Sequence, residues 1–304
     1  MSRSVARSVA RSVAGSVAGA LLVAGCTPAV APPPGPVAKP APAPPTYQRY
    51  AALGDSYSAG PLVPTSDLAG GCLRSDHNYP SLLAGQLRVG RLVDVTCSGA
   101  TTADLTRSQQ TFPDARVPPQ LDAVTADTDL VTLGIGGNDL GLFSTIVRTC
   151  TRLRAQDPTG SPCTARLART GPDLDGAART ISNRVTASLR RVRAKAPTAR
   201  VLLVSYLRLV PEQGTCPALP LAAGDYAVGR RLSRTLDRAL RSAAARTGVD
   251  FVDMRAASRG HDICADDPWV NGATTDRTRA LAYHPFAEGM AADAREVRRV
   301  LAGS

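Results

Sequence analysis

Four short stretches of the chain carry side chains that together could cleave an ester. They are "GDS", "SGA", "GGN" and "YHP", and they supply the residues Ser56, Gly99, Asn138 and His284. Acyl transfer to a serine needs a hydroxyl, a base, a group that orients the base, and donors aimed at the developing oxyanion. A hydroxyl, an imidazole, a neutral carboxamide and a glycine N–H meet most of these needs. Each stretch alone is common in turns, but their combination predicts a serine hydrolase site.

The elements that must position these residues follow from the apolar pattern. Apolar runs predict strands at 47–54, 91–100, 128–139, 199–206 and 247–254. Helices are expected between them at 79–89, 173–196, 226–247 and 285–301, the second with an apolar stripe of Ile181, Val185, Leu189 and Val192. Val/Leu-rich strands that alternate with helices predict an α/β fold, with a parallel sheet covered on both faces.

Three of the four stretches lie at the carboxyl end of a predicted strand. Ser56 follows the first strand, and Gly99 and Asn138 lie at the ends of the second and third. Ligand sites in parallel sheets form outside the carboxyl ends of the strands, so we expect the three to converge there. His284 precedes Pro285, a residue suited to the first turn of a helix, and this fixes the direction of the histidine at the sheet edge.

The order Ser, Gly, Asn, His resembles that of the SGNH hydrolases, also called GDSL esterases and lipases. The resemblance is to the exported, disulfide-containing actinobacterial branch of this family, and it covers the chain from Tyr47 to the C-terminus. The matching stretches are "GDSYSAG", "CSGATT", "GIGGND", "GHDICADDPWVNG" and "HPFAEG". The resemblance implies a three-layer α/β/α, flavodoxin-like fold around a central parallel sheet.

The resemblance also implies a role for each matching residue. Ser56 would be the nucleophile, and His284 the general base that later protonates the leaving alcohol. The N–H of Ser56, the N–H of Gly99 and the amide of Asn138 would form the oxyanion hole. No metal or other cofactor is implied.

One position departs from the family pattern. Many members carry an aspartate three residues before the histidine, where this chain has Leu281. A main-chain carbonyl near Trp269 could orient His284 instead, because a neutral acceptor also fixes the tautomer, and this is the favoured reading. The alternative is a carboxylate that folds back, from Asp266, Asp267 or Asp276.

The cysteines indicate an oxidising compartment. Apart from Cys26, the chain has an even number of them: Cys72, Cys97, Cys150, Cys163, Cys216 and Cys264. An even number in an exported domain predicts three disulfides, and the lack of CxxC pairs argues against a metal site. Pairing in sequence order is the simplest of the fifteen possible connectivities, and the family resemblance implies the same pairing.

The N-terminal region predicts export. Residues 1–25 have spaced arginines, no acid and an apolar end, as a secretory signal peptide does. The signal ends in "VAGC", which resembles the bacterial lipobox and predicts lipidation of Cys26; plain cleavage is the alternative. Residues 26–46 form a Pro/Ala-rich linker, and 47–304 form the hydrolase domain. The protein is expected on the outer face of the cell membrane, or secreted if the lipobox is not used.

Charge narrows the choice of partners. The formal net charge is +11, but the arginines are scattered and only four Phe and one Trp are present, so no nucleic-acid partner is expected. A basic surface favours anionic surroundings such as lipid head groups.

We therefore expect a monomeric carboxylic ester hydrolase that acts on acyl esters or lipids through an acyl-enzyme. The alternatives are a glycan O-acetyl esterase and a non-catalytic cell-surface binding lipoprotein. Acyl-chain preference is expected to depend on loops at 65–71 and 149–172.

Overall fold

The computed structural model describes residues 47–111 and 113–303. The predictions for the signal peptide, Cys26 and the linker lie outside the described residues. A parallel five-stranded sheet forms the centre of the domain, in the order β4 (Arg91–Asp94), β1 (Arg49–Gly54), β7 (Leu130–Gly134), β8 (Arg200–Val204) and β9 (Asp250–Val252). Counted along the chain within this sheet, the order is 2-1-3-4-5, which is the flavodoxin-like order. The predicted α/β fold is confirmed.

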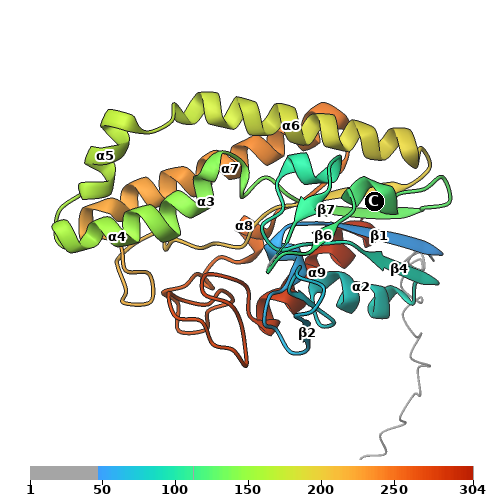
Figure 1. Ribbon diagram of the computed structural model, residues 1–304, viewed down its shortest axis with the longest axis horizontal. Coiled ribbons are helices and arrows are strands. Elements are labelled where there is room, and N and C mark those ends of the chain that lie inside the picture. Colours follow the sequence, from blue (N-terminus) through green and yellow to red (C-terminus); the bar gives the residue numbers. More distant parts are fainter. Residues whose placement is uncertain (1–46, 112, 304) are drawn as a thin grey trace, which may run out of the picture. The chain divides into compact units, whose positions relative to one another are not determined.

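Helices cover both faces of the sheet (Figure 1). One layer contains α6 (Leu174–Lys195) and α7 (Tyr226–Thr247), and the other contains α2 (Tyr79–Leu87) and α9 (Ala287–Ala302). The predicted stripe of α6 is fully buried at Ile181, Val185, Leu189 and Val192. Because both faces are covered, β7 is buried along its whole length, and so is β1 from Tyr50 onward.

Two of the strands end at least five residues earlier than the apolar pattern predicts. The predicted strand 91–100 stops at Asp94, and the predicted strand 128–139 stops at Gly134. Gly99 and Gly136 have φ values of +81° and +111°, which lie outside the β region and favour glycine. The residues that would have extended these strands instead form loops at the carboxyl edge of the sheet.

The chain enters the sheet at its amino edge, where β1 begins at Arg49. It reaches the carboxyl edge at Gly54, and Ser56 opens the short helix α1 (Ser56–Ala59) directly beyond it. The start of the domain and the predicted site are therefore separated by the full length of the strand.

Short elements fill the connections. Segment 139–170, partly predicted as loop, contains η3 (Asp139–Gly141), α3 (Leu142–Ser144), the π-helical turn η4 (Thr145–Cys150), α4 (Thr151–Leu153), η5 (Arg154–Gln156) and α5 (Pro162–Thr170). The other short helices are η1 (Thr102–Leu105), η2 (Gln120–Ala123), η6 (Ala223–Asp225) and α8 (Met254–Ala257). Two small ribbons pair β2 (Ser66–Asp67) with β3 (Arg74–Ser75) and β5 (Gln109–Gln110) with β6 (Arg116–Val117).

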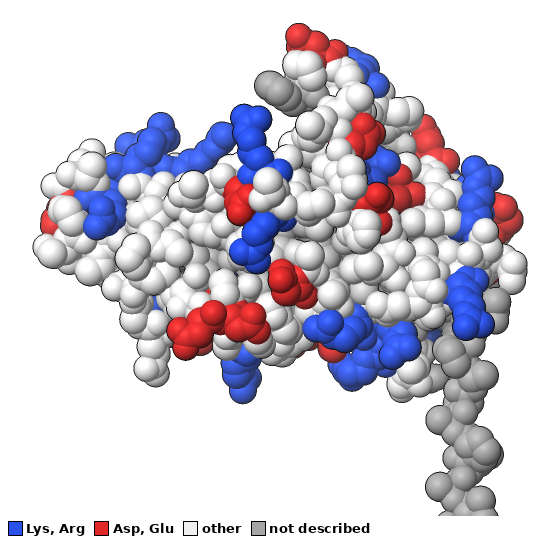
Figure 2. All heavy atoms as spheres, turned by 90° about the horizontal axis from the view of Figure 1, so that it is seen from below, with Lys and Arg blue, Asp and Glu red and all other residues white. Residues whose placement is uncertain are grey.

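Three disulfides join neighbouring parts of the chain in sequence order, as predicted. They are Cys72–Cys97, Cys150–Cys163 and Cys216–Cys264. No helix among the described residues has the length and apolar character needed to cross a bilayer. On the face seen in Figure 2, basic side chains form separate groups with acidic and uncharged surface between them.

Candidate active site

The four predicted residues line one cavity of about 450 Å³ at the carboxyl edge of the sheet. Its wall includes Ser56, Gly99, Asn138 and His284. In the sheet, β1 lies between β4 and β7, and the chain passes from β1 to β4 on one side before it returns to β7 on the other. The cavity lies at this reversal of strand order, the switch point at which ligands bind in such sheets. The expected convergence of the strand ends therefore occurs.

The turn that carries Ser56 is compact because two glycines lie beneath it. A Cβ at Gly54 would come within 2.4 Å of the Ser58 Oγ, and one at Gly134 within 2.5 Å of the same atom. The Asp55 carboxylate accepts a hydrogen bond of 3.0 Å from the Tyr57 N–H and so caps α1. Ser56 is thereby placed at the first position of a helix, and its side chain faces the cavity.

His284 contacts Ser56 directly. The His284 Nε2 lies 2.8 Å from the Ser56 Oγ, and the Nδ1 lies 2.8 Å from the carbonyl oxygen of Ala282. A carbonyl only accepts hydrogen bonds, so the neutral ring carries its proton on Nδ1. The Nε2 is then an acceptor for the Ser56 hydroxyl proton.

Burial makes the neutral form of this ring the stable one. It lowers the pKa of His284 to about 4, and the Ala282 carbonyl opposes this shift. The histidine is therefore uncharged at neutral pH and can act as a base.

The carbonyl that orients His284 comes from Ala282 rather than from Trp269. The Trp269 oxygen accepts a hydrogen bond of 2.9 Å from the Phe286 N–H, so it is used to hold the start of α9. Tyr283 adopts a φ of +64°, and this turn brings the preceding carbonyl back toward the His284 ring. The prediction of a carbonyl in place of a carboxylate agrees with this geometry, but the choice of Trp269 requires this correction.

The three aspartates considered as alternatives lie elsewhere. Asp276 is partly exposed and accepts a hydrogen bond from the Thr278 hydroxyl, and Asp266 and Asp267 are exposed. Among the described residues none of the three forms a hydrogen bond with His284. The ring of His261 stacks on Trp269 at 3.9 Å and bonds the Asp267 carbonyl, away from Ser56.

Three potential donors line the same cavity. The N–H groups of Ser56 and Gly99 form no hydrogen bond within the described part of the chain. The Asn138 Nδ2 donates one hydrogen to the Ala100 carbonyl at 2.9 Å, which holds the amide and leaves its second hydrogen available. This set suits an oxygen that gains negative charge.

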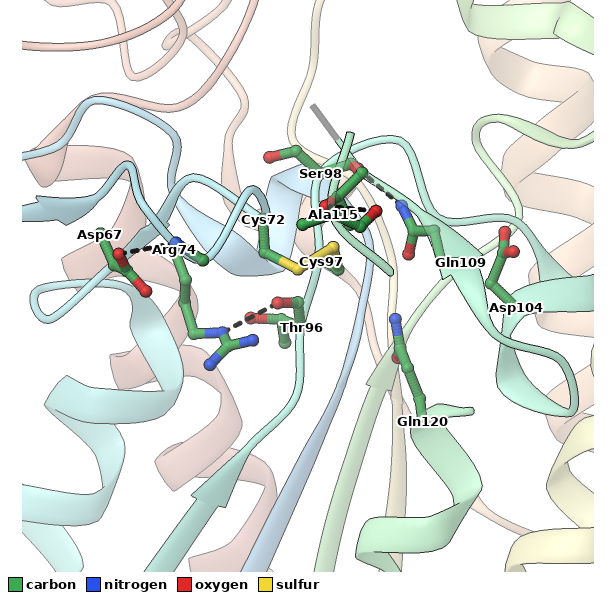
Figure 3. Close-up of a disulfide and its surroundings, with 12 residues drawn as sticks. Asp67, Cys72, Arg74, Thr96, Cys97, Ser98, Asp104, Gln109, Ala115 and Gln120 are labelled. Atoms are coloured by element: carbon green, nitrogen blue, oxygen red, sulfur yellow. Dashed lines mark hydrogen bonds between the residues drawn. A yellow bond between two sulfur atoms is a disulfide. The ribbon is translucent and has the colours of Figure 1, made fainter. Parts of the chain in front are cut away.

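The Gly99 loop is fixed on both sides. The Cys72–Cys97 disulfide precedes it, and the Gln109 side chain donates a hydrogen bond of 2.8 Å to the Ser98 carbonyl (Figure 3). Beyond the loop, the buried Asp139 accepts hydrogen bonds from the Thr102 N–H and hydroxyl at 3.0 and 2.6 Å. Residues next to Asn138 therefore hold the segment that carries Gly99.

A half-buried tyrosine joins two of the loops. The Tyr206 hydroxyl donates to the Asp55 carboxylate at 2.5 Å and accepts from the Gly137 N–H at 2.8 Å. Burial raises the pKa of Asp55 to about 7, while the hydrogen bond from Tyr206 opposes the rise. Sequence reasoning missed Tyr206, although its place directly after the β8 strand at the same sheet edge was a usable signal.

Two amide side chains were missed as well. The Asn271 Nδ2 donates to the carbonyls of Thr274 and Ala280, both at 2.9 Å, and so braces the segment before His284. The Gln120 amide bonds both the N–H and the carbonyl of Gly54. Asn271 lies in one of the matching stretches, whereas no sequence signal singles out Gln120.

Apolar side chains form much of the remaining wall, and among the described residues no group of three or more His, Cys, Asp or Glu could hold a metal ion. Phe143, Val147 and Leu281 line the cavity, and the Phe143 ring lies 5.9 Å from that of His284. The arrangement provides a hydroxyl, a neutral base and oxyanion donors beside an apolar surface.

Known proteins are similar to this chain in sequence and in fold. The sequence profile of the GDSL-like Lipase/Acylhydrolase family matches residues 52–292. The chain is 44% identical to Lipase 2 of Streptomyces coelicolor over 235 aligned residues. The alignment covers 75% of this chain and 76% of that protein.

Solved structures agree with this. The phospholipase A1 from Streptomyces albidoflavus has a TM-score of 0.65 and 30% identity, with 83% of this chain and 99% of that chain covered. The extracellular lipase from Streptomyces rimosus has a TM-score of 0.68 and 28% identity, with the same coverage of 83% and 99%.

Proposed function

The chain belongs to the GDSL-like lipase/acylhydrolase family and is a carboxylic ester hydrolase, and we propose that it acts through a Ser56–His284 pair and an acyl-enzyme. The observation that carries this proposal is the 2.8 Å contact between the His284 Nε2 and the Ser56 Oγ. A hydroxyl becomes a competent nucleophile when an adjacent base, itself oriented by a third group, takes its proton.

The proposed reaction has two halves. His284 takes the Ser56 proton as the Oγ attacks the ester carbonyl, and the resulting oxyanion accepts hydrogen bonds from the donors at Ser56, Gly99 and Asn138. Collapse of this intermediate expels the alcohol, which receives the proton from His284. Water, activated by the same ring, then hydrolyses the acyl-enzyme and restores Ser56. The Ala282 carbonyl stabilises the transient imidazolium, but less than a carboxylate would.

Acyl esters and lipids are the proposed substrates. The apolar wall of Phe143, Val147 and Leu281 supports an acyl chain, because apolar surface stabilises hydrocarbon by removing it from water. The names of the related proteins, a phospholipase A1 and lipases, support the same class. A polar glycan ester fits this wall less well.

Covalent labelling tests the nucleophile. A fluorophosphonate probe should label the wild-type protein and leave Ser56→Ala unlabelled, because the probe reacts only with an activated hydroxyl. Ser144→Ala is the matched control: Ser144 lines the same cavity, but its hydroxyl bonds the Gly141 carbonyl at 3.1 Å. Labelling that persists in Ser56→Ala would exclude Ser56 as the nucleophile.

Kinetics test the oxyanion donor. Asn138→Ala is expected to lower kcat about 10²- to 10³-fold with little change in KM, as removal of such a donor does in other hydrolases. A kcat within a factor of two or so of the wild-type value would remove Asn138 from this role.

We also propose that Cys26 is lipidated and anchors an exported monomer through the 26–46 linker. The three disulfides support export, since such bonds persist in oxidising compartments. Incorporation of labelled palmitate that is lost in Cys26→Ser would support the anchor. Equal release of both proteins into the medium would contradict it.

A further inference from the structure

A second cavity, of about 440 Å³, lies beside the proposed active site and is lined by three arginines. We call it the arginine cleft and define it by Arg107, Arg184 and Arg191. Arg184 and Arg191 are on α6, seven residues apart and therefore on one face of the helix. Arg107 follows η1, which packs against α6. Two separate elements thus bring their basic side chains to one place.

The charge of the cleft is only partly compensated. Arg184 pairs at 2.9 Å with Asp139, whose carboxylate is buried and is the only acid among the lining residues. Arg107 and Arg191 are exposed and have no carboxylate partner among the described residues. The cleft therefore carries two positive charges without counter-charge. A neighbouring cavity that shares Arg191 adds Lys195, together with one acid, Asp122.

The cleft adjoins the catalytic cavity through one shared residue and one shared loop. Asn138 lines both cavities, and the loop that presents Gly99 to the first continues into Thr101 and Thr102, which line the second. An ester carbonyl at the Asn138 amide would therefore lie where the two cavities meet. In a glycerophospholipid the phosphate lies one or two glycerol carbons from the acyl ester.

We propose that the arginine cleft binds the phosphodiester of a glycerophospholipid whose acyl ester is cleaved at Ser56; this rests on the proposed function. Arginine suits this ligand because its planar group donates paired hydrogen bonds to phosphate oxygens and is always charged. The apolar wall of the catalytic cavity accommodates the acyl chain, and the cleft accommodates the anionic head. The cleft thus sets a preference for phospholipid over neutral lipid.

A pair of substrates that differ only in the head group tests the proposal. Dihexanoylphosphatidylglycerol and dihexanoylglycerol share the acyl chains and the ester, and both are used below the concentration at which they aggregate. In Arg107→Gln/Arg191→Gln we expect KM for the phospholipid to rise about tenfold, the effect of losing charge-assisted hydrogen bonds at an exposed site, with kcat unchanged. The kinetics of dihexanoylglycerol should stay at the wild-type level.

The matched control removes the same charge elsewhere. Arg166→Gln/Arg169→Gln alters two exposed arginines of α5 that line neither cavity, and it should leave both substrates unaffected. An equal loss in this control would show a general attraction by net charge and would overturn the proposal. An equal loss on both substrates in the cleft variant would overturn it as well.

Two further arms identify the ligand and its place. Inorganic phosphate should inhibit hydrolysis of the phospholipid competitively in the wild type and not in the cleft variant. If phosphate competes but the wild type hydrolyses both lipids with the same kcat/KM, the cleft is a site for free phosphate and the proposal is overturned. Arg148 lines the catalytic cavity itself. Loss of the phospholipid preference in Arg148→Gln, with the cleft variant normal, would move the head group there and also overturn the proposal.

Failure of the proposed function would look different. In that case Ser56→Ala would still hydrolyse dihexanoylglycerol, a result that does not depend on the arginines.

Discussion

At the scale of single residues, the environment of His284 predicts the pH range of the enzyme. Burial without a carboxylate partner lowers the pKa of His284 to about 4, and only the neutral ring can accept the Ser56 proton. The acid limb of kcat/KM should therefore lie well below the ordinary histidine pKa of about 6.5. The measurement is the pH profile of kcat/KM with a p-nitrophenyl ester.

Leu281→Asp gives the comparison for this profile, because a carboxylate near the ring favours the imidazolium and should move the limb toward neutral pH. A wild-type acid limb near pH 6.5 would contradict the effect of burial.

The lowered pKa of His284 also makes the free energy of unfolding depend on pH. Between about pH 6.5 and 4, His284 is protonated in the unfolded chain but stays neutral in the folded protein. Its contribution to the free energy of unfolding therefore falls as the pH falls through this range.

Tyr206 is a positioning residue, because its hydroxyl joins the Asp55 carboxylate to the Gly137 N–H. Tyr206→Phe keeps the ring but removes the only hydrogen-bond partner of the Gly137 N–H among the described residues and one of the donors to the Asp55 carboxylate, which keeps its bond from the Tyr57 N–H. The free energy of unfolding should fall by about 1–3 kcal/mol, and kcat should fall about tenfold with KM nearly unchanged, since Gly137 directly precedes Asn138.

Thermal unfolding and steady-state kinetics measure these two effects. Tyr283→Phe is the control, because the Tyr283 hydroxyl forms no hydrogen bond with a described residue although the side chain lines the same cavity. Wild-type stability and kcat in Tyr206→Phe would show that the bridge has no role.

Single residues differ in how far the sequence predicts them. The contact between Ser56 and His284 follows from their places at one sheet edge, which the strand pattern already indicates. The Ala282 carbonyl does not, because every residue has a carbonyl and its direction depends on the positive φ of Tyr283. The place of Tyr206 at a predicted strand end indicates its position at the sheet edge but not its hydrogen bonds, and Gln120 acts through contacts with a distant segment, which no local pattern encodes.

At the scale of elements, the loop after β7 depends on a close approach of backbone to side chain. A Cβ at Gly137 would lie 2.9 Å from the Tyr206 hydroxyl oxygen and 3.0 Å from its ring. Gly137→Ala should therefore displace the loop and lower kcat by about tenfold or more, as small misplacements of catalytic groups do.

Gly85→Ala in α2 is the matched change, measured by the same kinetics and by denaturant unfolding. No atom lies within 4 Å of a Cβ at Gly85, and alanine in a helix should raise the free energy of unfolding by about 0.5–1 kcal/mol without altering kcat. Wild-type kcat in Gly137→Ala would mean that the loop tolerates the shift.

The sequence predicts long elements well and short ones poorly. The helix at 226–247 agrees with α7 residue by residue, because its apolar face repeats over many turns. The sequence predicts a loop at 149–172, yet this segment contains α4, η5 and α5. α4 and η5 have only three residues each, and the one fully buried side chain of α5 is Cys163, which forms the disulfide with Cys150. Tertiary contacts rather than periodicity therefore define this region.

At the scale of the whole molecule, three disulfides close loops of different length. The cysteines are 13, 25 and 48 residues apart in Cys150–Cys163, Cys72–Cys97 and Cys216–Cys264. The loop-entropy model assigns each bond about 3–4 kcal/mol, and most to the longest loop. Paired Cys→Ser variants should therefore lose stability in that order, as measured by denaturant unfolding.

Activity should follow a different order from stability. The Cys72–Cys97 bond adjoins the Gly99 loop, so its removal should lower kcat even where the protein remains folded. Removal of Cys216–Cys264 should lower stability with a smaller effect on kcat. A uniform loss of kcat across all three variants would contradict this local effect.

The entry of the chain at the amino edge of β1 has a practical consequence. The six residues of β1 span five rises and place Gly54 about 17 Å from that entry point, so a bead or carrier protein joined upstream of Tyr47 is attached at the end of β1 remote from Ser56. Immobilised in this orientation, the enzyme should leave the cavity around Ser56 accessible to large substrates such as vesicles. A carrier inserted at the Gly99 or Asn138 loop would obstruct it.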